Sequence, residues 1–208
     1  MTILNLDILE NAHLERDPFH FVVAPGIVSA ETLEALNRDY PEIDKPANYP
    51  PEELSYGPTF RQLLDELNSP KFRVAIEHKF GISLDGTLKT MTVRKYSELS
   101  DGNIHTDHRS KIITVLLYFN PEWTQDSGKL RFLRSKNDIE SYVQEVTPLG
   151  GTLLAFRRSS NSFHGYKRYV GERRMVQLNW VKSGKFAWYS QRLARFSTQT
   201  GKRLSRLL

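Results

Sequence analysis

The chain has 208 residues and a mass of 24.1 kDa, with 39% hydrophobic residues, 25% charged residues, a net charge of +5 and no cysteine. This length suits one hydrophobic core, and the composition is that of an ordered globular protein. The absence of cysteine excludes disulfides, thiolate metal sites, iron–sulfur clusters and a cysteine nucleophile. No apolar run reaches the roughly 20 residues of a membrane helix, and the N-terminus lacks a signal-peptide pattern, so we expect a cytoplasmic protein with no membrane partner.

The charge is unevenly distributed along the chain. Residues 1–66 contain 4 Lys/Arg and 13 Asp/Glu, whereas residues 67–208 contain 25 Lys/Arg and 11 Asp/Glu. An ordinary solvated surface with a basic tail accounts for this pattern, and so does an anionic substrate or partner attracted to the C-terminal two-thirds. Charge alone does not choose between these two interpretations.

The first stretch, residues 1–86, is predicted to form mainly helices and loops. A short strand-like run at 19–23 comes first, and five prolines between 41 and 58 predict a surface loop. Caps and stop signals predict three helices: from Ser29 to about Tyr40, from the capping box Thr59–Gln62, and from Ser69-Pro70 to Gly81.

The second stretch, residues 87–182, changes to strand-like patterns separated by turn residues. The predicted strands are 88–96, 111–119, 129–133, 141–146, 152–156 and 174–181. Many short strands predict an antiparallel sandwich or barrel. Because the early helices can cover one face of such a sheet, we expect a single α+β domain over 1–208, with a basic C-terminal helix or tail over 183–208.

The segment that carries chemistry is Asn103-Ile-His105-Thr-Asp107-His108. In a strand, residues i and i+2 point to the same side, so His105 and Asp107 can bind one ion together. A His-x-Asp pair alone is a weak signal, but His164 follows the next apolar strands and supplies a third ligand. Two histidines and one carboxylate on one face of a metal suit ferrous iron and leave about three positions open. His108 is a further candidate ligand, although its neighbouring position points it away from the other two.

From about Thr90 to Val181 the sequence resembles the iron(II)/2-oxoglutarate-dependent oxygenases, and within them the prolyl-hydroxylase-like branch. The shared features, in order, are His105-x-Asp107, Tyr118-Phe-Asn120, Ser127-Gly128-Lys-Leu-Arg-Phe, Pro148-x-x-Gly151-x-Leu-Leu-x-Phe156, His164 and a following arginine. The resemblance implies a double-stranded β-helix (jelly-roll) core flanked by N-terminal helices. It also implies Fe(II), 2-oxoglutarate and O2 as cofactor and cosubstrates, with ascorbate as a candidate reductant.

The distal carboxylate of 2-oxoglutarate needs a fixed cation, and arginine offers a two-pronged fork that matches it. Arg173 and Arg174 both follow His164, and side-chain alternation places them on opposite faces of their strand. Arg174 shares the more apolar face, which we expect to point inward, and the family spacing to Trp180 supports the same choice. We therefore predict that Arg174 binds the cosubstrate.

Two tyrosines complete the predicted cosubstrate site. Tyr118 matches a family tyrosine that hydrogen-bonds the same carboxylate, and Tyr96 is a further candidate for cosubstrate contact. Basic residues near the proposed mouth are candidates for binding an acidic substrate; they are Arg109, Lys111, Arg131, Arg134, Arg157, Arg158, Lys167 and Arg168.

The resemblance implies an active dioxygenase that hydroxylates an unactivated carbon and releases succinate and CO2. The substrate stays open between a protein side chain such as proline and a sugar, nucleotide or other metabolite, with loops 41–58 and 97–104 as candidate lids. Nucleic-acid dealkylation is disfavoured. The branch of the family that catalyses it usually carries a second arginine further along the last strand, and 176–181 contains none. Two other classes stay open: a non-catalytic jelly-roll module that binds a metal or an anion, and a nucleic-acid binder that uses the basic tail.

Overall fold

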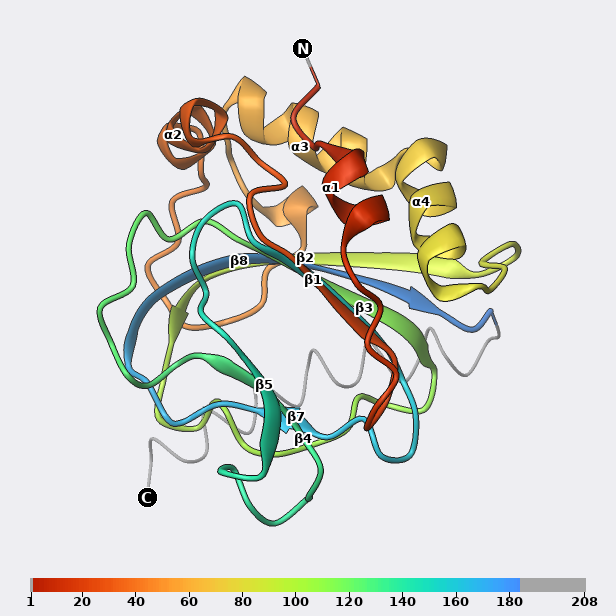
Figure 1. The fold of residues 1–208 in the computed structure, drawn as a ribbon. Coiled ribbons are helices and arrows are strands. Elements are labelled where there is room, and N and C mark those ends of the chain that lie inside the picture. The colour runs from red at the N-terminus through yellow and green to blue at the C-terminus, as the bar shows by residue number, and fades with distance from the viewer. Residues whose placement is uncertain (1, 184–208) are drawn as a thin grey trace.

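The computed structural model describes residues 2–183, and two antiparallel sheets form its framework (Figure 1). The larger sheet has the strand order β1-β6-β3-β8-β2, and the smaller sheet has the order β5-β4-β7. The strands are β1 (Phe21–Ala24), β2 (Leu88–Ser97), β3 (Lys111–Tyr118), β4 (Leu130–Leu133), β5 (Tyr142–Val146), β6 (Leu153–Arg157), β7 (His164–Gly165) and β8 (Gly171–Val181).

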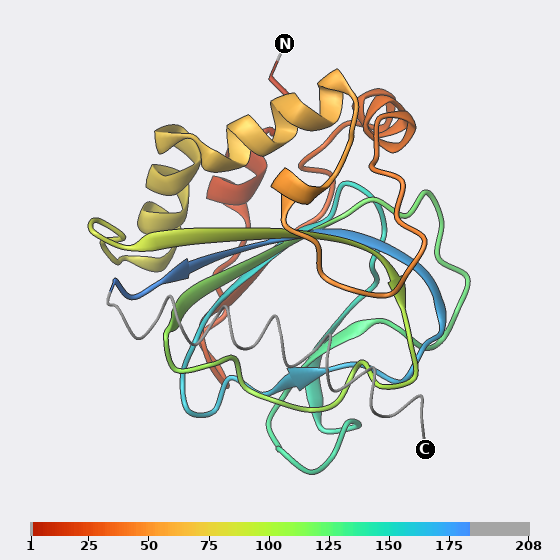
Figure 2. The same ribbon diagram turned by 180° about the vertical axis from the view of Figure 1, so that it is seen from behind.

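Helices cover one face of the larger sheet, and the smaller sheet lies on the side of its other face (Figures 1 and 2). The helices are α1 (Leu6–Asn11), α2 (Ala30–Arg38), the 3-10 turn η1 (Pro51–Glu53), α3 (Pro58–Asn68) and α4 (Pro70–Phe80). The larger sheet is therefore buried on both faces, although by different partners. Within the described residues, no helix combines the length and the apolar character needed to cross a membrane.

The predicted caps of two helices are confirmed. The Ser29 hydroxyl accepts a hydrogen bond from the Thr32 N–H at 3.2 Å, and the Ser69 hydroxyl accepts one from the Phe72 N–H at 3.1 Å. Gly81 ends α4 in the left-handed conformation with φ of 60°, which glycine adopts without steric cost.

The predicted capping box of α3 is wrong. The helix is capped by Gly57 and has Pro58 at its first position, and the Thr59 N–H is bound at 2.7 Å by the Asp39 carboxylate at the end of α2. A Cβ at Gly57 would overlap the Asp39 side chain. A carboxylate about 20 residues away thus replaces the local cap, and no local pattern indicates it.

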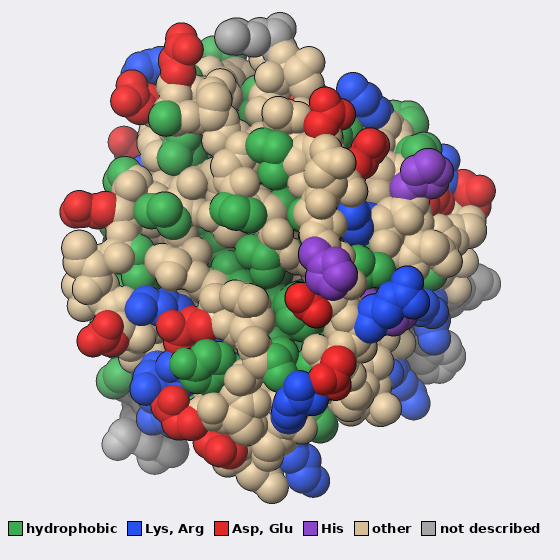
Figure 3. Space-filling model, in the orientation of Figure 1, with side chains coloured by type: hydrophobic (Ala, Val, Ile, Leu, Met, Phe, Trp, Pro, Cys, Tyr) green, Lys and Arg blue, Asp and Glu red, His purple; other side chains and the backbone are tan. Residues whose placement is uncertain are grey.

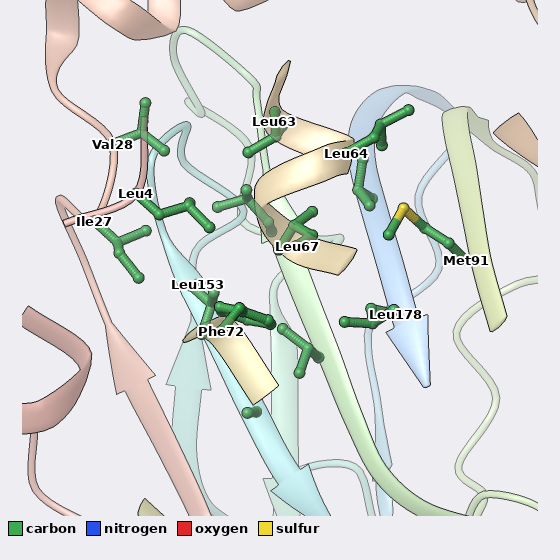
Figure 4. Packing of buried hydrophobic residues seen from close by; sticks show 14 of the residues in the cluster. Leu4, Ile27, Val28, Leu63, Leu64, Leu67, Phe72, Met91, Leu153 and Leu178 are labelled. Atoms are coloured by element: carbon green, nitrogen blue, oxygen red, sulfur yellow. The ribbon is translucent and has the colours of Figure 1, made fainter. Parts of the chain in front are cut away.

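The helix-facing side of the larger sheet holds the main hydrophobic core (Figure 4). Leu63, Leu64 and Leu67 from α3 point toward strand residues such as Leu153 and Leu178. Phe72 of α4 stacks on Trp180 of β8 with ring centroids 6.1 Å apart. A second apolar cluster lies between the sheets, around Phe19, Phe21, Phe132 and Phe156.

The six strands predicted over residues 87–182 are confirmed with small shifts at their ends. The predicted run at 19–23 becomes β1 two residues later, and β8 begins three residues earlier than expected. The two-residue strand β7 and the helix α1 were not predicted. The expected C-terminal helix, with Phe186, Tyr189, Leu193 and Phe196 at helical spacing, lies outside the described residues.

Candidate metal centre and cosubstrate pocket

A cavity of about 270 Å³ lies between the two sheets and contains the predicted metal ligands. The larger sheet contributes side chains from β2, β3, β6 and β8, and the smaller sheet contributes Leu130 of β4 and His164 of β7. The loop at 41–58 reaches the cavity through Asn48, and the loop at 97–104 reaches it through Asp101 and Gly102. Both loops that the sequence analysis named as candidate lids therefore border the same space.

The structure brings His105, Asp107 and His164 together. One potential ligand atom from each of these residues lies within 4.8 Å of the others, although His105 and His164 are 59 residues apart in the chain. His105 and His164 exchange backbone hydrogen bonds of 3.0 and 2.9 Å, which fixes the two rings side by side with centroids 4.4 Å apart. The carboxylate and the His164 ring are buried, whereas the His105 ring is exposed.

Backbone carbonyl groups fix which ring nitrogen of each histidine is free. His105 Nδ1 lies 2.8 Å from the Asn103 carbonyl oxygen, and His164 Nδ1 lies 3.0 Å from the Ser162 carbonyl oxygen. Because a carbonyl only accepts, each Nδ1 carries the proton and each Nε2 keeps a free lone pair. This is the arrangement by which metal-binding histidines are usually oriented.

The charge states also suit a divalent cation. Burial favours the neutral carboxyl of Asp107, but the Lys111 ammonium and hydrogen bonds from Lys111 and Thr114 outweigh burial and hold its pKa at about 2. Burial lowers the pKa of His164 to about 4, although Asp107 opposes this shift. At neutral pH the site therefore offers an ionised carboxylate and an unprotonated His164 imidazole, the form in which these groups bind metals.

Two neighbouring side chains position the carboxylate. Lys111 Nζ lies 2.7 Å from Asp107 Oδ1, and the Thr114 hydroxyl donates a short hydrogen bond to Oδ2. Thr114 in turn lies 3.2 Å from the amide oxygen of Asn179 on β8. From the sequence, Lys111 was predicted only as a basic residue near the mouth and Thr114 was not predicted, because neither belongs to a motif that marks a metal ligand.

The arginine that faces the cavity is Arg173. Its side chain is buried, its Nη2 donates to the Tyr118 hydroxyl at 2.9 Å, and its Nε donates to the Gly128 carbonyl at 2.9 Å. Its guanidinium also lies over the Tyr166 ring, 4.4 Å from the centroid. No carboxylate of the described residues pairs with Arg173. Its guanidinium is therefore a fixed positive charge in the cavity that can bind an anion.

The prediction that Arg174 faces the cavity is wrong. Its guanidinium lies on the helix-facing side of β8, where it pairs with Glu172, donates to the Asn37 side chain at 2.8 Å and lies over the Tyr40 ring. The prediction assumed that the more apolar face of the strand points to the site. Both faces are buried, however, and the apolar one packs against the helices.

Of the other predicted residues, Tyr118 lies at the site, whereas Tyr96 and His108 do not. The Tyr118 hydroxyl is buried beside Arg173, and burial raises its pKa, so it is a neutral hydrogen-bonding group. Tyr96 is not among the cavity-lining residues, and Lys95 stacks on its ring. Tyr166, which the sequence analysis missed, lines the cavity in its place. His108 bonds to the Ser110 hydroxyl through Nδ1 and does not join the three-residue cluster.

Four of the basic residues named near the mouth are already paired with acids. Arg131 binds Glu140 and Glu145, Lys167 shares Glu140, and Arg134 pairs with Asp17. Lys111 pairs with Asp107 and is the only one of these four that lines the cavity. The remaining basic residues of that set form no ion pair within residues 2–183.

The comparisons agree with this geometry. Residues 91–182 match the family model of the 2OG-Fe(II) oxygenase superfamily, a range that contains all three candidate ligands and Arg173. A search of curated proteins found no match.

Among solved structures, the chain is similar to a prolyl-4-hydroxylase from Pseudomonas putida, with 18% identity, 86% of this chain and 93% of that chain covered, and a TM-score of 0.56. It is also similar to a prolyl hydroxylase from Trichoplax adhaerens in complex with a hypoxia-inducible-factor peptide (18%, 85% and 89% covered, TM-score 0.54). A third similar structure is a viral collagen prolyl hydroxylase from Paramecium Bursaria Chlorella virus-1 (13%, 81% and 98% covered, TM-score 0.51).

At these identities the solved structures show a shared fold, whereas the family model covers the residues that carry the chemistry. The donor set and the buried arginine fit Fe(II) and 2-oxoglutarate, and the match over residues 91–182 supports a 2-oxoglutarate-dependent hydroxylase of the 2OG-Fe(II) oxygenase superfamily.

Proposed function

We propose that this hydroxylase converts 2-oxoglutarate and O2 to succinate and CO2 while it hydroxylates an unactivated carbon of a peptide or protein side chain. The observation that carries the proposal is the cavity in which His105, Asp107 and His164 converge beside a buried, acid-free Arg173. We further infer that the two sheets around this cavity form the double-stranded β-helix expected from the sequence.

His105, Asp107 and His164 would hold Fe(II) through the two Nε2 atoms and one carboxylate oxygen. Three ligands on one face leave positions for the cosubstrate and for O2. When bound, the ferrous centre with its cosubstrates supplies the oxidant that replaces a C–H bond by C–OH. The protein has to supply ligation, orientation and shelter from water, and no side chain needs to act as a general base.

Arg173 would bind the distal carboxylate of 2-oxoglutarate. Its Nε and Nη2 are held by the Gly128 carbonyl and the Tyr118 hydroxyl, so the guanidinium is oriented before the anion arrives. Tyr118, whose hydroxyl accepts from Arg173, would donate its own proton to the same carboxylate. Such preorganisation reduces the entropic cost of binding.

Two contacts hold the loop at 97–104 against one side of the cavity. Arg94 of β2 pairs with Asp101, and the Tyr166 N–H donates to the Gly102 carbonyl at 2.9 Å. A Cβ atom at Gly102 would overlap Tyr166, so glycine allows the loop backbone to approach Tyr166 closely. The loop would exclude water from the reacting atoms once a substrate covers the opening.

A peptide or protein substrate is supported by the similar solved structures, which are prolyl hydroxylases, one of them in complex with a peptide. The test is a succinate-release assay with Fe(II), 2-oxoglutarate and ascorbate across a peptide library, with amino acids, sugars and nucleotides as further arms. We expect peptide-stimulated release that disappears in His105→Ala and persists in the matched control His108→Ala. Succinate release that survives His105→Ala would refute the assigned metal site, and stimulation by small metabolites alone would refute the peptide class.

A further inference from the structure

Four basic residues outside the metal site lie at one end of the larger sheet. Arg109, Arg157, Arg158 and Lys182 lie where β3 begins and where β6 and β8 end. Backbone hydrogen bonds hold these ends together, from the Arg158 N–H to Ile112 and from the Lys182 N–H to Ser110, each at 2.9 Å. We refer to these four residues as the cationic rim.

The charge of the cationic rim is not neutralised. None of its members forms an ion pair within residues 2–183, and Arg109, Arg157 and Lys182 are exposed. The pKa of neighbouring His20 is lowered by burial and by the positive charges of Arg157 and Arg16, which agrees with a locally positive potential. Residues 184–208 contain no Asp or Glu and therefore offer no acidic side chain to the rim. In Figure 3, Lys and Arg side chains gather on the right, where β8 ends in the same view of Figure 1.

The rim is continuous with the metal site. Arg158 Nε donates to the backbone carbonyl of Asp107 at 3.3 Å, and Arg109 lies two residues after this metal ligand. The loop that follows Arg158 leads directly to His164. A chain lying across the rim would therefore pass close to the metal ligand Asp107, although the rim residues themselves do not line the cavity.

We propose that the cationic rim docks an acidic peptide segment of the substrate, next to the residue that is hydroxylated. This inference rests on the proposed function, which it deepens by naming the chemistry of the substrate. Carboxylates on the peptide complement four cations that lack acidic partners within residues 2–183. Such complementarity speeds the association of peptide and protein and fixes the register in which the peptide binds.

Within residues 2–183, the surface features favour a peptide over a nucleic acid. Proteins that bind single strands without sequence preference stack bases on exposed aromatic rings. The one large aromatic residue that is strongly exposed in this part of the chain is Tyr142 on β5, and the Arg131 guanidinium lies over its ring, 4.3 Å from the centroid. The cationic rim itself contains no aromatic side chain.

The test uses the full chain and measures the fluorescence anisotropy of a labelled decaglutamate peptide at increasing salt. The rim variant carries Arg109→Glu, Arg157→Glu and Lys182→Glu. The matched control carries Lys45→Glu, Lys71→Glu and Lys136→Glu, which are exposed and unpaired within residues 2–183, so both variants have the same net charge. Arg158 is left intact because it contacts Asp107. A single-stranded DNA decamer and phosphatidylglycerol vesicles serve as the other polyanions.

We expect the rim variant to lose about tenfold or more in affinity for decaglutamate and the control to lose less than about threefold, with salt weakening the wild-type complex. Equal losses in the two variants, no loss in the rim variant, or tighter binding of DNA or vesicles would overturn the proposal. Succinate release by the wild-type protein with the peptide library is measured separately. If no peptide stimulates that release, the proposed function fails, while the anisotropy data still decide whether the rim binds an acidic peptide.

Discussion

The two faces of the larger sheet are both buried, but they are buried for different purposes. On β8, Val176, Leu178 and Trp180 point into the core beneath the helices, whereas Arg173 and Gln177 point into the cavity between the sheets. Along these positions the first face is apolar and packed. The second lines the cavity, and its Arg173 has no carboxylate partner within residues 2–183.

Burial by packing and burial beside a binding site therefore leave opposite residue patterns on the same strand. A packed face excludes polar groups because they cost free energy without partners. A cavity face retains them because a metal or cosubstrate supplies the partners. The two faces should therefore respond differently to substitution.

The largest expected effect is on stability and comes from the helix-facing side. Leu178→Ala should lower the free energy of unfolding by about 2–5 kcal/mol, because it leaves a cavity in a packed core. Its neighbour Gln177→Ala should cost no more than about 1 kcal/mol, the net value of a typical hydrogen bond. Urea denaturation measures both. Equal losses would show that the cavity face is packed as tightly as the helix face.

The two adjacent arginines provide the sharpest functional comparison. Arg173→Met should raise the KM for 2-oxoglutarate about 10- to 100-fold, the range expected for hydrogen bonds to a charged group. Arg174→Met should change this KM less than about twofold, because its guanidinium lies among α2 residues and Glu172. Succinate release at varied 2-oxoglutarate concentrations decides between them, and the reverse ranking would restore the sequence-based choice of Arg174.

The cavity face should also respond to pH in metal-free protein. The pKa of His164 falls from 6.5 to about 4 on folding, so between these values the unfolded chain binds more protons than the folded one. The free energy of unfolding should therefore fall as pH drops from 6.5 toward 4, by at most about 1.4 kcal/mol per pH unit, and be insensitive to this group above 6.5. In His164→Asn this contribution should vanish. Parallel pH profiles of the two proteins, measured by urea denaturation with a chelator present, would contradict the assignment.

The smallest expected effect concerns the hydrogen bond that positions the carboxylate. Thr114→Val keeps the shape of the side chain but removes the donor to Asp107 Oδ2, and it should weaken Mn(II) binding about tenfold. Thr92→Val on β2, which β8 separates from β3, is the matched control, since no hydrogen bond joins its side chain to the site. Titration calorimetry without cosubstrate measures both, and an unchanged affinity in Thr114→Val would assign this hydroxyl a purely structural role.

Much of the fold could be predicted from the sequence because its signals are local. The Ser29 and Ser69 caps, the stop at Gly81 and the strand-like runs each depend on neighbouring residues. The start of α3 could not be predicted, because its capping carboxylate comes from Asp39 in another helix. The two-residue β7 is too short for any periodic signal.

The candidate ligands could be proposed from the sequence because residue type, order and spacing all restrict them. The choice between Arg173 and Arg174 could not be made in this way, because alternation separates the two side chains but does not say which face holds the site. Tyr166 and Thr114 reach the cavity only through the pairing of distant strands and loops. Tyr96 was named only as a further candidate for cosubstrate contact, and the register shift between Arg94 and Tyr96 interrupts the regular side-chain alternation there.

The most direct test is a crystal structure of the protein with Mn(II) and 2-oxoglutarate, with the ion located by its anomalous scattering. We predict one ion bound by His105, Asp107 and His164, with the distal carboxylate of 2-oxoglutarate paired with Arg173. An ion held elsewhere, or a carboxylate bound to Arg174 beneath the helices, would contradict it.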